Sequence, residues 1–311
     1  MNTIGAYLAI GFMRLLAILP LSVVRGLGWL LGSALFYVIR SRRRVAEINL
    51  TLCFPEHSRQ QIRRLARQNF VYFMQALLDR GWLWHGSAAT TLRRLKITGA
   101  VEQLQNDEPV VLFVPHFVGL DAGNTAFTQQ IPRKLITIYT NQSNKTVDAW
   151  ILKRRARFGN VRLFGRVAGV KEIVAALRSG EMLGILPDMG FGPEESIVVP
   201  FYGIPTYTVP SLHRFARLGS VKGPSKGSSK GSSKGSSKGS AKVVPVLNRM
   251  TKYGYDIEIL PAWENFPTDN IEADTARMNK ELETYIASMP AQYFWVHKRF
   301  KDTPPGEKAI Y

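Results

Sequence analysis

The chain has 311 residues, of which 45% are hydrophobic, so it can bury the core of one large domain or of two small ones. Its 41 Lys and Arg residues against 23 Asp and Glu give a formal net charge of +18, which indicates a polyanionic partner such as nucleic acid, an anionic membrane surface or an acidic protein. The single cysteine, Cys53, excludes an internal disulfide framework and a cysteine-rich metal site, and its apolar neighbours favour a buried packing thiol over a nucleophile.

The N-terminal segment is strongly apolar. Residues 4–39 are interrupted mainly at Arg14, at Pro20 and at the pair 25–26, so neither half is a charge-free run of about 20 apolar residues, the length that a spanning helix needs. A basic cluster at 40–44 follows, and such clusters suit the anionic headgroups of a cytoplasmic leaflet.

We therefore interpret residues 1–45 as an uncleaved membrane-anchoring helical segment that either spans the bilayer or lies deep in it, with the catalytic domain at 46–311 on the cytoplasmic side. A helical hairpin buried in the globular domain is the alternative. A cleaved signal peptide is disfavoured, because the apolar stretch is too long and has no obvious cleavage site.

The rest of the chain alternates between helical and strand patterns. Helices are expected at 57–95, 120–129, 146–158, 169–179 and 270–288, and strands at 110–114, 135–139, 182–186, 243–247 and 255–260. This alternation predicts an α/β layered domain with a mixed sheet.

Residues 221–240 depart from this pattern. They repeat Lys-Gly-Ser-Ser and carry no apolar side chain between Val221 and Ala241, so they are expected to form a disordered insert in a surface loop between a helix and a strand. A functional basic segment is the alternative. The lysines of the repeat also raise the net charge, which weakens the case for nucleic acid.

His116 and Asp121 are the candidate catalytic residues. His116 follows the strand at 110–114, which places it at the carboxyl edge of the sheet, where open α/β sheets collect reactive groups. Gly119 permits a turn that could bring the Asp121 carboxylate to the imidazole. A neutral imidazole can accept a proton from a hydroxyl, and a carboxylate on its other nitrogen fixes the tautomer. The nucleophile is then the acceptor's hydroxyl. A histidine with a purely structural role at a strand end is the alternative.

Further motifs accompany this pair. Asp188 ends another expected strand and should face the same edge, and distinctive segments lie at 49–56, 186–189, 198–205 and 292–301. Together they resemble the late acyltransferases of bacterial lipid A biosynthesis, the lauroyl/myristoyl family. The resemblance covers essentially the whole chain except 221–240.

The resemblance implies a bacterial inner-membrane protein with an N-terminal anchor and a cytoplasmic, glycerolipid-acyltransferase-like catalytic domain. Such enzymes transfer an acyl chain from acyl carrier protein to a hydroxyl of a lipid A precursor, in lipopolysaccharide biosynthesis. The implied partners are acyl carrier protein, the lipid A precursor and membrane lipids, without nucleic acid. No cofactor is implied, and the sequence shows no metal-ligand set.

The resemblance also assigns residues. His116 and Asp121 match the family's catalytic dyad, although many members carry Glu at the second position. Arg166 matches a basic residue expected to hold phosphate or the developing oxyanion, with a surface arginine as the alternative. Asp188 belongs to a Pro-Asp motif and is expected to position substrate or to support Arg166.

Two other functions remain open at this point. The same chemistry could act on another membrane lipid, such as a glycerophospholipid or an ornithine lipid. The second is a basic, non-enzymatic protein that binds membranes or nucleic acid.

Overall fold

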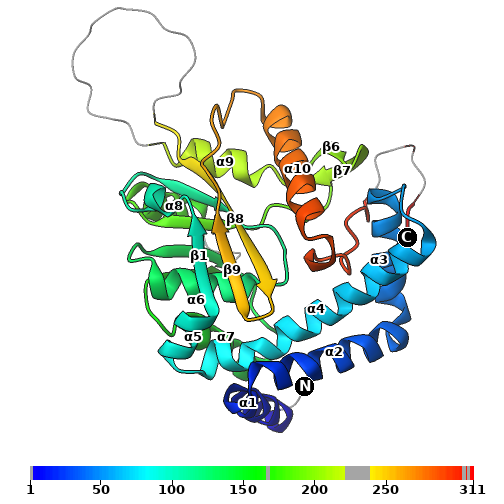
Figure 1. Ribbon diagram of the computed structural model, residues 1–311. Helices are drawn as coiled ribbons and strands as arrows, with labels where there is room; N and C mark the ends of the chain where they lie inside the picture. The colour runs from blue at the N-terminus through cyan, green and yellow to red at the C-terminus, as the bar shows by residue number, and fades with distance from the viewer. Residues whose placement is uncertain (1–2, 166–168, 221–238, 303–305, 307–308) are drawn as a thin grey trace, which may run out of the picture.

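The structure, a computed structural model, describes residues 3–165, 169–220, 239–302, 306 and 309–311 (Figure 1). Within these residues, seven strands form one mixed sheet in the order β1-β9-β8-β2-β5-β3-β4. The strands are β1 (Leu95–Gly99), β2 (Val110–Phe113), β3 (Leu135–Tyr139), β4 (Val161–Gly165), β5 (Met182–Ile185), β8 (Lys242–Thr251) and β9 (Gly254–Ile259). A separate antiparallel pair consists of β6 (Ile197–Phe201) and β7 (Ile204–Thr208).

The centre of the sheet is parallel. β2 runs parallel to β5 on one side and to β8 on the other, β3 is parallel to β5 and β4, and the β8–β9 pair is antiparallel. The predicted mixed α/β sheet is therefore confirmed. Parallel strands have their carboxyl ends at the same edge, so the segments after β2 and β5 emerge side by side.

Helices cover both faces of this sheet. Along β2, Val110 and Leu112 face one layer while Val111 and Phe113 face the other, and all four are buried. The first layer contains α5 (Ala88–Arg94), α6 (Leu120–Gln130) and α7 (Lys145–Arg155), and the second contains α8 (Val170–Arg178), α9 (Ser211–Leu218) and α10 (Ile271–Ser288). Burial on both faces explains why these strands are continuously apolar.

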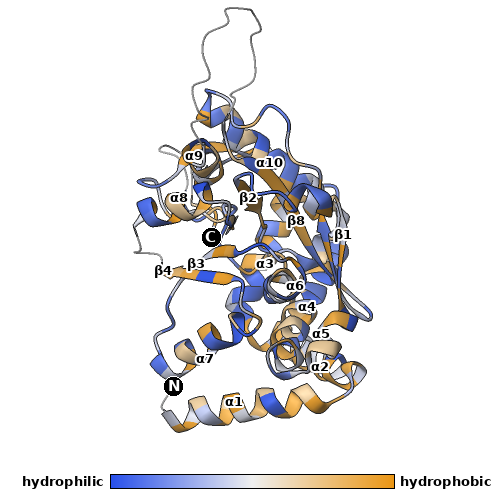
Figure 2. Cartoon of the chain, turned by 90° about the vertical axis from the view of Figure 1, so that its left-hand side faces the viewer, coloured by the Kyte–Doolittle hydropathy of each residue, from blue (hydrophilic) through white to orange (hydrophobic). Residues whose placement is uncertain are grey.

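The N-terminal helices form a further layer on α4 (Arg59–His85), which runs beneath the sheet in Figure 1. Helix α2 (Leu21–Val38) approaches α4 at backbone distance, since a Cβ atom on Gly32 would lie 2.5 Å from the Cα of Val71. Near its start, Arg25 forms an ion pair of 2.8 Å with the buried Asp79 of α4. Helix α1 (Thr3–Ile18) lies at the edge of the molecule, and α3 (Arg40–Cys53) follows α2 (Figure 2).

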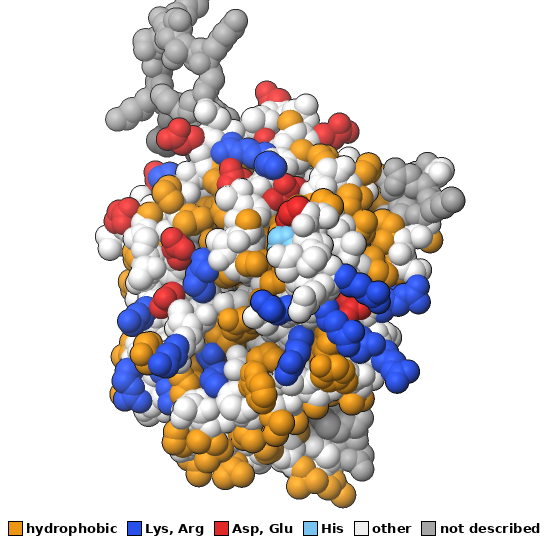
Figure 3. All heavy atoms as spheres, turned by 45° about the vertical axis from the view of Figure 1, so that its right-hand side comes forward, with side chains coloured by type: hydrophobic (Ala, Val, Ile, Leu, Met, Phe, Trp, Pro, Cys, Tyr) orange, Lys and Arg blue, Asp and Glu red, His pale blue; other side chains and the backbone are white. Residues whose placement is uncertain are grey.

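The faces of α1 and α2 that do not pack on the rest of the protein are apolar and exposed. Large exposed side chains on these helices are Ile4, Tyr7, Leu8, Phe12, Leu15, Ile18, Val23, Leu27, Trp29, Leu30, Leu31, Tyr37 and Val38. Figure 3 shows hydrophobic side chains gathered at the bottom of the molecule, with arginine and lysine side chains in a band above them. In the described part of the chain, α2 is the one helix whose length and composition would let it cross a membrane, and 28% of it is buried within the protein.

Two further expectations concern the boundaries of segments. Most of the expected insert, residues 221–238, lies outside the described residues; it is flanked by α9 and β8, the expected helix and strand. The expected boundary at residue 45 falls inside α3.

Candidate functional site

His116 lies just after β2, at the carboxyl edge of the sheet. Its ring Nδ1 is 2.7 Å from Oδ1 of Asp188, and its backbone N–H donates to Oδ2 of the same carboxylate at 2.9 Å. Asp188 follows β5, the parallel neighbour of β2, so the sheet order itself brings the two residues together. Because the carboxylate accepts a hydrogen bond from Nδ1–H, Nε2 is left as the basic ring nitrogen.

Asp188 is fully buried and is held from a third direction. The hydroxyl of Tyr293 donates to its Oδ2 at 3.0 Å. Burial by itself would raise the pKa of Asp188, but the charge of His116 and the hydrogen bonds from its ring and backbone outweigh this and lower the pKa. Asp188 is therefore an ionised partner for the imidazole.

The segment that carries Tyr293 is fixed by two asparagine side chains. The amide nitrogen of Asn69, on α4, donates to the carbonyl oxygens of Ala291 and Tyr293. Farther along the segment, Asn49 of α3 donates to the carbonyl oxygens of Trp295 and His297. Both asparagines are buried, so α3 and α4 determine where Tyr293 lies.

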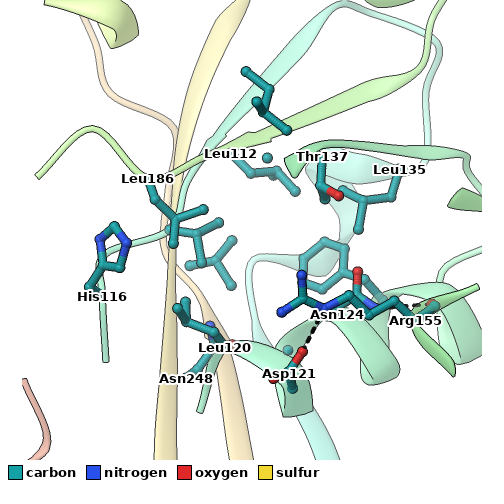
Figure 4. Close-up of a pocket in the computed structure, with 16 residues that line it drawn as sticks. Leu112, His116, Leu120, Asp121, Asn124, Leu135, Thr137, Arg155, Leu186 and Asn248 are labelled. Carbon is teal, nitrogen blue, oxygen red and sulfur yellow. Dashed lines mark hydrogen bonds and ion pairs between the residues drawn. The ribbon is translucent and has the colours of Figure 1, made fainter. Parts of the chain in front are cut away.

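Asp121 lies in the first turn of α6 and forms a separate charged cluster. Its two carboxylate oxygens each accept a hydrogen bond of 2.8 Å, one from Nε of Arg80 on α4 and one from Nε of Arg155 at the end of α7. Burial would raise the pKa of Asp121, but the charges of Arg155 and Arg80 outweigh it and lower the pKa to about 2. Figure 4 shows the Asp121 carboxylate directed at Arg155.

The structure thus places the candidate residues in two neighbouring groups. The carboxylate on the His116 ring is that of Asp188, in the place where the His-x₄-Asp spacing suggested Asp121. Asp121 still borders the same cavities as His116. Arg166 lies outside the described residues, so its role stays a prediction.

Arg80, Arg155 and Tyr293 were not singled out from the sequence. Tyr293 falls in a segment that carried the family resemblance, so its position was marked although its role was not. The two arginines lie on helices far from Asp121 in the chain. An aspartate in the first turn of a helix does not indicate which distant arginines will pair with it.

Two cavities meet at His116. The first, about 270 Å³, lies on the α6 side of the sheet, over β2, β3, β5 and β8 (Figure 4). Its lining is mainly apolar: Leu112, Val114, Leu120, Gly123, Phe127, Leu135, Ile138, Gly184, Leu186 and Val246, with His116, Asp121, Asn124, Thr137, Arg155 and Asn248 as the polar members.

The second cavity, about 260 Å³, opens along α4. It is lined by Phe73, Ala76, Leu77, Arg80 and Leu83 of that helix, by His116, Phe117, Val118, Leu120, Asp121 and Ala122, and by Tyr255 and Phe294. Each cavity therefore has one arginine of the Asp121 cluster in its wall, and both reach His116. The arrangement can receive two apolar chains on either side of one base.

Cys53 takes no part in this site. It is 3% exposed within the core, and burial raises the pKa of its thiol, so the reactive thiolate is disfavoured. The prediction of a buried packing thiol is confirmed.

Comparison with known proteins identifies the family. The model of the bacterial lipid A biosynthesis acyltransferases matches residues 1–222 and 226–302. The chain belongs to this family. It is similar to the lipid A biosynthesis palmitoleoyltransferase of Escherichia coli (strain K12), with 28% identity over 310 residues that cover 98% of this chain and 94% of the relative.

Other members of the family are similar over the same length. The lipid A biosynthesis lauroyltransferase of Escherichia coli (strain K12) is 28% identical over 98% of this chain and 94% of the relative. The lipid A biosynthesis myristoyltransferase of the same organism is 29% identical over 99% of this chain and 90% of the relative. The predicted resemblance is confirmed, and the named acyl group differs from one relative to the next.

Proposed function

We propose that this chain transfers a fatty acyl group from acyl carrier protein to a hydroxyl of a lipid A precursor, with His116 as the general base. The observation that carries the proposal is the buried Asp188 carboxylate on Nδ1 of His116, at the point where two largely apolar cavities meet. Family membership supports the reaction class, and the relatives named above act in lipid A biosynthesis.

The proposed reaction is a direct acyl transfer. Nε2 of His116 takes the proton from the acceptor hydroxyl while its oxygen attacks the thioester carbonyl, and Asp188 stabilises the imidazolium that forms. When the tetrahedral intermediate collapses, the carbon–sulfur bond breaks and the leaving thiolate takes the same proton back from His116. The base is thus regenerated in each turnover.

Asp121 has a positioning role in this proposal. Its one negative charge faces the two positive charges of Arg80 and Arg155, so the cluster keeps a net positive charge beside the reacting carbonyl. The guanidinium groups can stabilise the developing oxyanion or hold a phosphate of the donor or acceptor. Arg166, predicted for the same task, would add to this charge. The chain's positive net charge also suits an acidic carrier protein and a phosphorylated lipid.

Transfer can be tested with the purified chain in phospholipid vesicles. Acyl-carrier-protein thioesters are supplied with a lipid A precursor and, in competition, with a glycerophospholipid and an ornithine lipid, and products are weighed by mass spectrometry. The proposal expects an added acyl mass on the lipid A precursor. Transfer only to another lipid would replace the acceptor, and the absence of transfer to every acceptor would overturn the proposed function.

We also propose an inner-membrane location, with α1 and α2 in the plane of the cytoplasmic leaflet. Helix α2 packs along its whole length on α4, from Arg25 at Asp79 to Phe36 beneath Arg63. If α2 crossed the bilayer in this position, the charged residues of α4 would enter the hydrocarbon, at a cost of about 3 kcal/mol each.

The position of the arginines supports the in-plane arrangement. The guanidinium of Arg43 lies 5.4 Å from the ring of Phe36, and that of Arg67 lies 5.9 Å from the ring of Trp29. Trp29 belongs to the exposed apolar face of α2, so Arg67 borders that face where lipid headgroups would meet it.

Cysteine labelling distinguishes the two arrangements. Ser22→Cys and Ser41→Cys stand near opposite ends of α2 at exposed positions, and the native Cys53 is buried. An in-plane α2 predicts that both cysteines react with a membrane-impermeant maleimide from the cytoplasmic side only. Labelling of the two positions from opposite sides would show that α2 spans the membrane.

A further inference from the structure

A row across the middle of the sheet forms the floor of the first cavity. Leu112 of β2 and Thr137 of β3 both pair in register with Gly184 of β5, and all three line the cavity. The neighbours of Gly184 along the strand, Leu183 and Ile185, belong to the core on the other face of the sheet. The glycine therefore leaves a gap in the floor between two side-chain-bearing strands.

Neither the backbone nor the packing requires glycine at this position. Gly184 is not among the residues with positive φ. A Cβ atom there would lie 3.6 Å from Cδ1 of Leu135 and 3.7 Å from Cγ2 of Thr137, which are ordinary contacts with two cavity-lining side chains. Glycine weakens the interior of a strand, and where it occurs there it often marks the close approach of a ligand. What Gly184 provides is space inside the cavity.

The position of this space relative to the base gives it a function. In Figure 4, His116 lies at one end of the cavity, while Leu135 and Thr137 lie at the other. An acyl group whose carbonyl reacts beside His116 would run along the apolar lining with its methyl end toward Gly184. The depth of the floor then limits the number of methylenes that fit.

We propose that Gly184 determines the length of the acyl chain that this enzyme transfers, by leaving open the far end of the cavity. The inference rests on the proposed acyl transfer and adds a specificity-determining residue to it. Relatives that are 28–29% identical to this chain are named for different acyl groups. A single side chain on the floor of the cavity would change the depth of the cavity, which offers a physical reason for this difference.

The test measures kcat/KM for decanoyl, lauroyl, myristoyl and palmitoyl thioesters of acyl carrier protein. Gly184→Ala and Gly184→Val fill the floor stepwise, and Leu135→Ala enlarges it from the neighbouring strand. Gly26→Ala is the matched control, because a Cβ atom at Gly26 would meet nothing within 4 Å.

We expect the glycine variants to shift the preference toward shorter donors and Leu135→Ala to shift it toward longer ones. A pocket discriminates one methylene by about 10-fold or more in kcat/KM. Take the longest donor that the wild-type enzyme uses well and the next shorter one. Gly184→Ala should lower the ratio of kcat/KM for the longer donor to kcat/KM for the shorter donor by at least that factor. Gly184→Val should lower it further, and Gly26→Ala should leave the profile unchanged.

The outcomes distinguish a failure of the role of Gly184 from a failure of the proposed acyl transfer. Folded, active glycine variants with the wild-type donor profile would overturn the role of Gly184. If both glycine variants fail to fold, Leu135→Ala decides, and an unchanged or shortened preference in that variant would overturn it as well. A wild-type chain that transfers no acyl group from any donor would instead contradict the proposed function.

Discussion

The two buried aspartates at the sheet edge differ in the kind of partner that each one holds. Asp121 lines both cavities, Asp188 reaches them only through the ring of His116, and the pKa of each carboxyl is lowered despite burial. Asp188 faces an imidazole, which can accept and release a proton, whereas Asp121 faces two guanidinium groups, which stay protonated. The first pair can support proton transfer, and the second cluster supplies fixed charge. The sequence motifs indicate both carboxylates as site residues, but they do not show which one supports proton transfer and which one holds the arginines.

Removal of the base should have the largest effect. His116→Ala is expected to lower kcat by about 10²–10⁴-fold, the range that general acid–base catalysis contributes. Acyl transfer is measured by mass spectrometry, with circular dichroism as the check on folding. His57→Ala, whose ring pairs with Glu56 away from both cavities, is the control and should retain full activity. Near-normal rates for folded His116→Ala would eliminate the assigned base.

Replacing each aspartate by its amide tests the comparison directly. Asp188→Asn keeps the size of the side chain but cannot stabilise the imidazolium, so kcat should fall by about 10²-fold or more. Asp121→Asn leaves both arginines in place and should act more on KM than on kcat. Steady-state kinetics of both variants decide the matter. A greater loss of kcat in Asp121→Asn would mean that Asp121, not Asp188, serves His116 during turnover.

The lowered pKa of Asp121 predicts a loss of stability in acid. Since the folded-state pKa of about 2 lies below the usual 3.8, the carboxylate stabilises the fold above about pH 4. This contribution, on the order of 2 kcal/mol, is lost as the pH falls through the folded-state pKa. Urea unfolding across this range should show a shallower pH dependence for Asp121→Asn. Asp269→Asn, which removes an exposed partner of Arg217, should keep the wild-type slope, and equal slopes for all three proteins would argue against the coupling.

The smallest effect is expected from exchanging one cation for another. Arg155→Lys keeps the charge at Asp121 but loses the planar donor geometry, at a cost of about 1 kcal/mol in the free energy of unfolding. Arg162→Lys changes an arginine that is half exposed in its pair with Glu181 and should cost less than about 0.5 kcal/mol. Thermal melts compare the two, and equal losses would mean that the Asp121 cluster is no stronger than a surface ion pair.

Much of the fold follows from local sequence patterns. The apolar run at 110–114 became β2, and the amphipathic stretch at 169–179 became α8 almost to the residue. The strands that were not predicted are β1, β4 and the β6–β7 pair. β1 and β4 lie at the edges of the sheet, where partly exposed positions such as Lys96 and Arg162 break the apolar pattern. The helix expected at 57–95 is in fact α4, α5 and the start of β1.

The candidate site was predictable only in part, because its partners are determined by tertiary structure. The position of His116 after a buried strand was enough to place it at the carboxyl edge. Its pairing with Asp188 depends on β2 and β5 being neighbours, which a strand pattern alone does not reveal. The contact between Tyr293 and Asp188 joins residues 105 positions apart and depends on where α3 and α4 hold the later segment.

The two asparagines that hold this late segment have a consequence for biosynthesis. The ribosome synthesises α3 and α4, which carry Asn49 and Asn69, early, whereas Tyr293 emerges only after all the strands of the sheet. A growing chain can assemble the sheet and still lack the hydroxyl that completes the Asp188 environment. The surroundings of Asp188 are therefore completed only near the end of translation, after α3 and α4 and all the strands of the sheet have been synthesised.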